Sequence, residues 1–127
     1  MKKVLIVDDD EGVTFTFKIT MDALQANYDI LTASDGVKCM KALQQGITPD
    51  IILLDIMMPN MDGIETIKQI KTNDEWKDIP IIFLTARMDL VNHENIPYKV
   101  EGYIEKPFEA EYLKEKIDGI LTNGNNQ

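Results

Sequence analysis

The sequence predicts an α/β fold: a doubly wound parallel sheet of five strands with helices on both faces. Short unbroken apolar runs recur along the chain and are typical of strands buried on both faces. Stretches of helical periodicity separate them, such as the apolar residues at positions 13, 17, 21 and 24. Strands that alternate with helices imply right-handed crossovers, and five such units in 127 residues fit one small flavodoxin-like domain.

The individual elements follow in chain order. Strands are predicted at residues 4–7, 28–33, 51–54, 79–84 and 102–104, the fourth with Pro80 near its start. Helices are predicted through the apolar positions 13–24, 37–43, 64–70 and 112–121. The second is capped by Ser34 or Asp35 and ended by Gly46, and the last begins near Phe108. We expect a single domain over residues 1–127, with a frayed polar tail at 122–127.

The segment between the fourth and fifth predicted strands is expected to be irregular. Within residues 88–100, the part before Pro97 has only four apolar side chains, at positions 88, 90, 91 and 96, and Pro97 disfavours a helical conformation at Ile96. After Arg87 we expect at most about two helical turns, because short helices depend on tertiary packing. With few apolar contacts to hold it, this segment is predicted to have low local stability.

Composition and charge exclude several classes of function. The chain is 44% hydrophobic and carries a net charge of −9, so its surface repels nucleic acid backbones and anionic membranes. We therefore expect no direct contact with nucleic acid or membrane. The first apolar run is too short for a signal peptide or a membrane span, so a cytoplasmic location is expected. We also expect a monomer. The single cysteine, Cys39, excludes an internal disulfide and a cysteine-based zinc site, and its apolar helical setting predicts a buried, inert thiol.

Reactive side chains stand at the ends of four predicted strands. The first strand ends in three aspartates at residues 8–10, the third in Asp55 and the fourth in Thr85, and the fifth leads to Lys106. Because ligands of open α/β sheets bind beyond the carboxyl ends of the strands, these groups should converge there. Clustered carboxylates repel one another, and Mg²⁺ with a phosphate would relieve that repulsion. Asp10 fits the N-terminus of the following helix better than the metal.

Four motifs together carry a resemblance to a known family. They are Val7-Asp8-Asp9-Asp10, Leu54-Asp55-Ile56-Met57-Met58-Pro59-Asn60-Met61-Asp62-Gly63, Phe83-Leu84-Thr85-Ala86 and Tyr103-Ile104-Glu105-Lys106-Pro107-Phe108. In this order, and at the ends of these strands, they resemble the receiver domain of bacterial two-component response regulators. The resemblance covers the whole chain and suggests a chemotaxis-type, single-domain regulator.

The resemblance implies a set of metal and phosphoryl ligands. Asp55 matches the phosphoacceptor, which takes a phosphoryl group from the phosphohistidine of a sensor histidine kinase or a phosphotransfer protein. Asp9, Asp55 and the backbone carbonyl of Met57 match the ligands of Mg²⁺, for which Mn²⁺ is a substitute. Asp8 matches the acid that helps to hold this metal, partly through water.

The resemblance also implies how phosphorylation is sensed. Thr85 and Lys106 match the groups that bind the phosphoryl oxygens, and Tyr103 matches an aromatic that changes rotamer on activation. The surface near the fifth strand and the fourth and fifth helices would then change. Residues 88–100 depart from the family pattern but border Thr85 and Tyr103, so we expect phosphorylation to order them and create a binding face for a partner. The Lys106-Pro107 bond matches a cis peptide of the family.

Self-dephosphorylation is expected to be slow. In the family, the side chains two positions after the phosphoacceptor and after the threonine overhang the path of the attacking water. Here these are Met57 and Arg87. Neither offers a carboxylate or amide suited to orienting that water, so the expected product is a long-lived phosphoprotein.

Two other functions remain open on the residues alone. A phosphohydrolase with an aspartyl nucleophile usually has a second acid two residues later, where this chain has Met57. A flavin-binding module would need a phosphate-binding loop rich in Ser, Thr or Gly after the first strand. The chain is compatible both with a stand-alone protein and with a receiver taken from a longer one.

Overall fold

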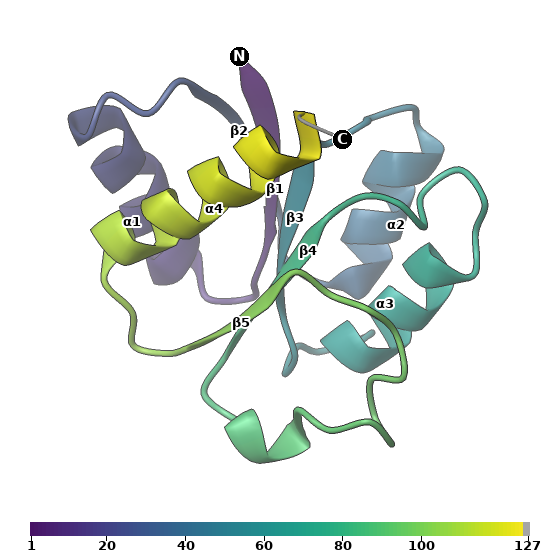
Figure 1. Cartoon of the computed structure of the whole chain (residues 1–127). Coiled ribbons are helices and arrows are strands. Elements are labelled where there is room, and N and C mark those ends of the chain that lie inside the picture. Colours follow the sequence, from purple (N-terminus) through teal and green to yellow (C-terminus); the bar gives the residue numbers. More distant parts are fainter. Residues whose placement is uncertain (126–127) are drawn as a thin grey trace.

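A five-stranded parallel sheet forms the centre of the computed structural model, which describes residues 1–125 (Figure 1). The strand order is β2-β1-β3-β4-β5. The elements are β1 (Lys2–Val7), α1 (Glu11–Ala23), β2 (Tyr28–Ala33), α2 (Gly36–Gln44), β3 (Ile51–Asp55), α3 (Gly63–Lys71), β4 (Ile81–Thr85), the 3₁₀ helix η1 (Met88–Leu90), β5 (Gly102–Glu105) and α4 (Ala110–Asn125). The predicted fold class is confirmed.

Alternate residues of the central strands pack against two separate layers of helices. In β3, Ile52 and Leu54 face the layer of α2 and α3, whereas Ile51 and Leu53 face the layer of α1 and α4. Figure 1 shows the two pairs of helices on opposite sides of the sheet. Every residue of β3 and β4 is buried, as expected for strands covered on both faces. Cys39 is completely buried in the first layer, as predicted.

Three aspartates set the starts of the first three α-helices. The side chain of Asp10 accepts from the backbone of Gly12 and Val13, and that of Asp62 accepts from Glu65. Asp35 caps α2, which decides between the two predicted caps of that helix. Each cap satisfies backbone N–H groups that have no partner inside their own helix. The helices therefore begin close to the carboxyl ends of β1, β2 and β3.

The segment between β4 and β5 is irregular, as predicted, but it is better anchored than the sequence suggested. Its only regular element is η1, so the fourth connection of the (βα)₅ pattern contains no α-helix within residues 86–101. Ile96 is only 3% exposed and belongs to the core of the α2–α3 layer. The side chain of Asn95 donates to the carbonyl oxygen of Leu90. The expectation that few apolar contacts hold this segment is therefore wrong.

Several predicted boundaries differ from the structure by a few residues, and two of the differences have a physical reason. The fourth strand begins at Ile81, because the prolyl nitrogen of Pro80 cannot donate to a neighbouring strand. α4 continues to Asn125, so residues 122–125 are helical and do not form the predicted frayed tail. Poor helix formers cost little in a last turn whose backbone bonds are already directed to the preceding turn. Residues 126–127 of the predicted tail lie outside the described residues. Within residues 1–125, no helix has both the length and the apolar character needed to cross a membrane.

The burial of Ile96 generates a prediction about stability. Ile96→Ala should lower the free energy of unfolding by about 2 to 4 kcal/mol, because it removes three methyl or methylene groups from a closed core. Urea denaturation measures this loss. Val91→Ala, in a half-buried position of the same segment, is the matched control and should cost clearly less. Equal losses in the two variants would show that Ile96 does not anchor the segment.

Candidate functional site

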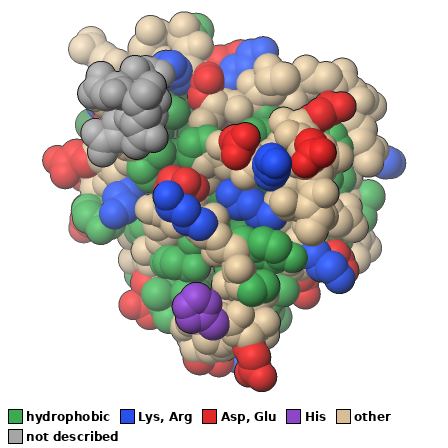
Figure 2. All heavy atoms as spheres, turned by 45° about the vertical axis from the view of Figure 1, so that its right-hand side comes forward, with side chains coloured by type: hydrophobic (Ala, Val, Ile, Leu, Met, Phe, Trp, Pro, Cys, Tyr) green, Lys and Arg blue, Asp and Glu red, His purple; other side chains and the backbone are tan. Residues whose placement is uncertain are grey.

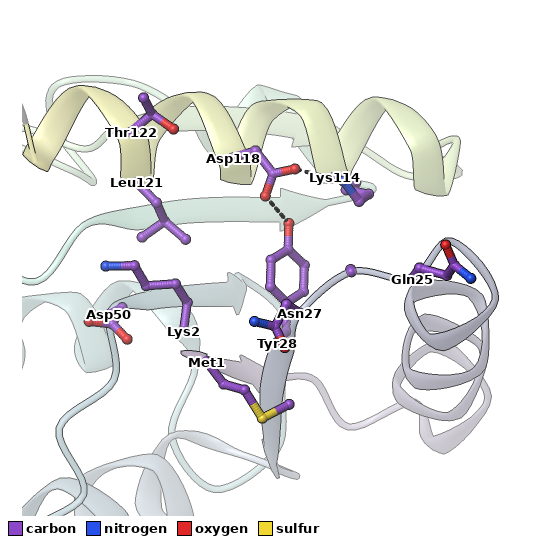
Figure 3. A pocket seen from close by; sticks show the side chains of 11 residues that line it. Met1, Lys2, Gln25, Asn27, Tyr28, Asp50, Lys114, Asp118, Leu121 and Thr122 are labelled. Atoms are coloured by element: carbon purple, nitrogen blue, oxygen red, sulfur yellow. Dashed lines mark hydrogen bonds and ion pairs between the residues drawn. The ribbon is translucent and has the colours of Figure 1, made fainter.

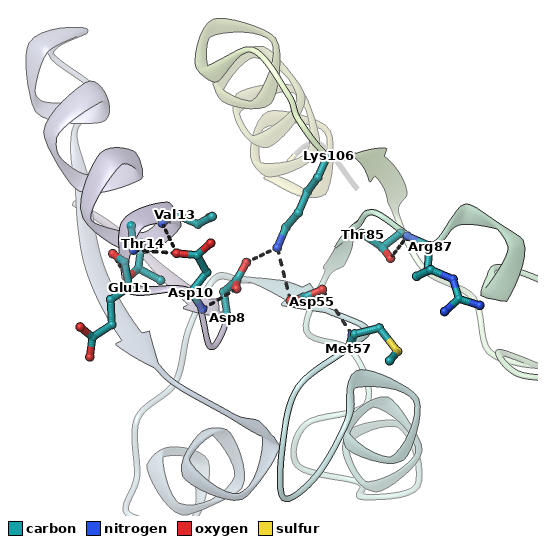
Figure 4. A network of polar contacts seen from close by, with 11 residues as sticks. Asp8, Asp10, Glu11, Val13, Thr14, Asp55, Met57, Thr85, Arg87 and Lys106 are labelled. Atoms are coloured by element: carbon teal, nitrogen blue, oxygen red, sulfur yellow. Dashed lines mark hydrogen bonds and ion pairs between the residues drawn. The ribbon is translucent and has the colours of Figure 1, made fainter.

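The predicted site residues meet at the carboxyl edge of the sheet (Figure 4). Asp8 follows β1, Asp55 ends β3, Thr85 ends β4 and Lys106 follows β5. The chain runs from β1 outward to β2 and then returns to β3, so the switch in strand order lies between β1 and β3. Asp8 and Asp55 flank this switch point, where open α/β sheets bind their ligands.

Three carboxylates form the acidic part of the site. Asp8, Asp9 and Asp55 each offer one oxygen atom, and these atoms lie within 4.8 Å of one another. Asp8 and Asp55 are buried, at 2% and 5% exposure, whereas Asp9 is exposed to solvent. Asp10 points away to cap α1, as predicted. The arrangement is thus a cluster of oxygen donors that is open on one side.

Lys106 supplies the opposite charge. Its Nζ atom lies 2.5 Å from Asp8 Oδ2 and 3.3 Å from Asp55 Oδ2. The peptide bond from Lys106 to Pro107 is cis, as expected, and the backbone N–H of Lys106 donates to the carbonyl oxygen of Thr85. Burial lowers the pKa of Lys106, but the hydrogen bond to Asp8 and the charges of both aspartates outweigh burial and raise it. The lysine is therefore held as a cation facing two carboxylates.

The surroundings of Asp55 disfavour the ionisation of its carboxyl group. Burial, followed by the negative charge of Asp8, raises the pKa of Asp55 to about 6, although Lys106 opposes this shift. The backbone N–H of Met57 also contacts Asp55 Oδ1, at 3.4 Å. Positive charge brought to the cluster would favour the carboxylate form of Asp55, which is the nucleophilic form.

Thr85 and its neighbours connect the site to the irregular segment. Thr85 is fully buried, and its Oγ1 atom accepts a 2.8 Å hydrogen bond from the backbone N–H of Arg87. The guanidinium of Arg87 donates twice to Asp89, at 2.9 Å each, and Figure 4 shows it directed away from Asp55. Tyr103 is partly exposed, and its ring stacks on that of Phe83 at 5.9 Å. Thr85 ends β4 as the sequence predicted, whereas the guanidinium of Arg87 is turned toward Asp89 and, contrary to the expectation, does not overhang Asp55.

A groove of about 570 Å³ opens beside the lysine. Its walls come from the start of α1 and from residues 106–110, with Phe17 and Phe108 among the lining side chains. Met57, which is 52% exposed, lies on the other side of Asp55. The carboxylates therefore have a groove with apolar walls on one side and the exposed side chain of Met57 on the other.

A second hollow, of about 660 Å³, lies at the opposite end of the sheet (Figure 3). There Tyr28 donates a hydrogen bond to Asp118, which also pairs with Lys114. Burial and this contact with Asp118 raise the pKa of Tyr28. These groups satisfy one another and join β2 to α4, and the amino ends of the strands lie away from the switch point. We interpret this hollow as a structural feature.

Two contacts near the site were not predicted from the sequence. The side-chain amide of Asn60, in the loop after β3, donates a hydrogen bond to the carboxylate of Asp35 at the start of α2. The carboxylate of Asp89 forms an ion pair with the guanidinium of Arg87. The first joins residues 25 positions apart, and no local pattern marks such a pair. The second had a visible signal, because an acid two residues after the only arginine of the chain can reach its guanidinium.

The raised pKa of Asp55 generates a prediction for the protein without metal. Because the pKa of Asp55 is higher in the folded chain than in the unfolded chain, ionisation of this carboxyl group lowers the free energy of unfolding. The loss develops as the pH rises from about 4 to about 6, and it is present in full at higher pH. Asp55→Asn should therefore raise the free energy of unfolding at pH 7.5 by about 1 to 3 kcal/mol, with little gain at pH 4. Urea denaturation in the presence of a chelator measures both values. Asp62→Asn, at an exposed cap where asparagine substitutes well, is the control. A gain of equal size at both pH values would contradict the prediction.

Comparison with known proteins identifies relatives over almost the whole chain. The transcriptional regulator RpaA of Synechocystis, described as DNA-binding, is 30% identical over 95% of this chain and 49% of its own length. A chemotaxis protein CheY homologue of Campylobacter jejuni is 30% identical over 98% of this chain and 96% of its own length. A CheY-like receiver domain protein of Methanospirillum hungatei is 36% identical in structure-based alignment, with a TM-score of 0.82 over 99% of this chain and 98% of that one.

The chain spans about half the length of the first of these relatives and nearly all of the second. The model of the response regulator receiver domain matches residues 4–118. Receiver domains are the phosphoacceptors of two-component signal transduction; they bind Mg²⁺ at an acidic pocket and are phosphorylated by histidine kinases. Because the model of that domain matches most of the length of this chain, the chain belongs to the family of response regulator receiver domains.

Proposed function

We propose that this chain is a signalling switch in which Asp55 accepts a phosphoryl group from the phosphohistidine of a histidine kinase or phosphotransfer protein. The observation that carries the proposal is the buried carboxylate of Asp55 at the switch point, with Lys106 and a cluster of oxygen donors around it. Phosphoryl transfer needs mainly positioning and neutralisation of charge, and these groups supply both.

The donor set fits a small divalent cation. Three carboxylates face one ammonium group, so Lys106 alone does not balance Asp8, Asp9 and Asp55. All available ligands are oxygen atoms, which suits Mg²⁺, with Mn²⁺ as a substitute. In the proposed site Asp9, Asp55 and the carbonyl of Met57 hold the metal, and Asp8 holds it partly through water. When bound, the cation neutralises charge on the phosphoryl oxygens.

The transfer itself is an in-line displacement at phosphorus. A carboxylate oxygen of Asp55 forms the new bond to phosphorus, while the bond from phosphorus to the histidine nitrogen of the donor breaks and its electron pair stays on that nitrogen. Lys106, which bridges Asp8 and Asp55 in the unphosphorylated chain, binds a phosphoryl oxygen in the product. Thr85 binds another through its hydroxyl group. Met57, two residues after Asp55, has no proton to exchange, which disfavours a phosphohydrolase.

The contacts of Thr85 suggest how phosphorylation changes the surface. A hydroxyl group drawn to the phosphoryl group would weaken its bond from the N–H of Arg87. Arg87 begins the chain of turns through η1, because its carbonyl oxygen accepts from Leu90. Tyr103 of β5 pairs with Phe83 of β4, the strand that leads into this segment. We therefore propose that the surface that changes on phosphorylation comprises residues 86–91 and Tyr103, since no α-helix lies between β4 and β5 in the described part of the chain.

We propose a protein as the downstream target. The net charge of −9 disfavours direct binding to nucleic acid. On the face shown in Figure 2, basic side chains are interspersed with acidic ones around hydrophobic groups, an arrangement that does not favour a polyanion. A relative such as RpaA, described as DNA-binding, is about twice as long as this chain. We propose that the chain acts as a cytoplasmic monomer, which accepts a phosphoryl group and then binds its target protein directly.

Phosphorylation at Asp55 is directly testable. Incubation with Mg²⁺ and acetyl phosphate should add one phosphoryl group, detected by intact mass. Asp55→Asn and excess chelator should each abolish the adduct, because they remove the nucleophile and the cation respectively.

A second variant separates metal binding from phosphoryl recognition. Lys106→Ala should still bind Mg²⁺, measured by calorimetry, but should change its surface poorly on phosphorylation, because it loses a charge-assisted contact to the phosphoryl group. An adduct at another residue, or none in the wild-type chain, would refute the proposed function.

Slow loss of the phosphoryl group is a separate prediction. Met57→Asn together with Arg87→Glu should speed hydrolysis at least about threefold, because an amide and a carboxylate can orient the attacking water. The decay of the phosphorylated mass with time measures the rate. Met57→Leu, of similar size and polarity, is the control and should decay as the wild type does. Unchanged decay in the double variant would contradict the prediction.

A further inference from the structure

A buried carboxylate outside the phosphorylation site contacts the loop that leaves Asp55. Asp35 is 5% exposed and lies at the start of α2. One of its oxygen atoms accepts from the backbone N–H of Lys38, at 2.9 Å, which is an ordinary helix cap. The other oxygen accepts from the side-chain amide of Asn60, at 2.7 Å. Capping needs only the first contact, so the second requires its own explanation.

Asn60 belongs to the loop of residues 56–62, which joins β3 to α3. Its backbone has a positive φ of 66°, a conformation that asparagine and glycine adopt more readily than other residues. A second bond joins the same surfaces one residue further along, because the N–H of Gly36 donates to the carbonyl oxygen of Met61. The far half of the loop is therefore attached to α2 by one side-chain and one backbone hydrogen bond.

Two glycines, Gly36 and Gly63, allow the loop to pack closely against the start of α2 and the end of β3. A Cβ atom at Gly36 would lie 2.8 Å from the carbonyl oxygen of Met61 and closer still to Thr66. One at Gly63 would lie 2.2 Å from the carbonyl oxygen of Asp55. The loop thus packs with backbone against backbone at both ends. Met57 lies in this loop between Ile56, whose carbonyl oxygen accepts from the N–H of Gly63, and the attached residues Asn60 and Met61.

We propose that Asp35 and Asn60 are positioning residues for the metal site: their hydrogen bond fixes the loop that carries the Met57 carbonyl ligand, and so sets the affinity for Mg²⁺. This inference rests on the proposed function. Neither side chain touches the metal. Groups that orient ligands in this way change metal affinity substantially in other proteins. The Asp35–Asn60 pair places this control on α2, at the edge of the sheet away from β5.

The test is Asn60→Gly, which keeps the positive φ without strain and removes only the side-chain amide. Calorimetric titration with Mg²⁺ should give an affinity about threefold to tenfold weaker than in the wild type. The Mg²⁺ concentration for half-maximal phosphorylation by acetyl phosphate should rise by the same factor, with the rate at saturating Mg²⁺ nearly unchanged. General destabilisation would not produce this separation between affinity and maximal rate.

Three further variants of the chain serve as controls. Asp35→Ala should weaken Mg²⁺ binding as Asn60→Gly does. Asp35→Asn should keep the affinity of the wild type, since asparagine also caps helices and can form a hydrogen bond with Asn60. Tyr28→Phe removes a buried hydrogen bond at the far end of the sheet and should leave the affinity unchanged. Wild-type affinity in Asn60→Gly overturns the positioning role alone. A wild-type chain that binds no Mg²⁺ refutes the proposed function, and this inference with it.

Discussion

The ion pairs of Lys106 with Asp8 and Asp55 are the interaction on which the site depends. They join residues that follow or end β5, β1 and β3, so they hold together the carboxyl ends of strands from both sides of the switch point. Truncating Lys106 would leave two buried carboxylates without their counter-charge, which is strongly destabilising. The lysine nevertheless leaves the three carboxylates with excess negative charge, and this imbalance makes the site receptive to a cation and a phosphoryl group.

The placement of these charges follows from the sheet, and for that reason the sequence predicted most of the site. A parallel sheet brings the ends of its strands to one edge, so strand ends read from apolar runs identify neighbours that are far apart in the chain. Asp8, Asp55, Thr85 and Lys106 were all found in this way. The caps at Asp10 and Asp35 were also recognisable, because a capping side chain bonds to the backbone two or three residues away.

Contacts that depend on tertiary packing were beyond the sequence. Ile96 lies in a polar stretch before a proline, and nothing local shows that it reaches the core under α2 and α3. The bond between Asn60 and Asp35 likewise depends on how closely the loop after β3 approaches α2. The end of α4 was placed too early, because polarity alone does not distinguish a final helical turn from a coil.

The irregular segment after η1 also has a consequence for how such a domain can diversify. A helix in this place would constrain every third or fourth residue through its packing face. Here Ile96 is the one deeply buried side chain of the segment, half-buried Leu90, Val91, Tyr98 and Val100 pack on the same core, and the neighbouring residues 92–94 are exposed. Exposed loop residues tolerate substitution and changes of length far better than helical ones. Homologous chains could therefore acquire new recognition sequences around this one buried isoleucine while the acidic pocket stays the same.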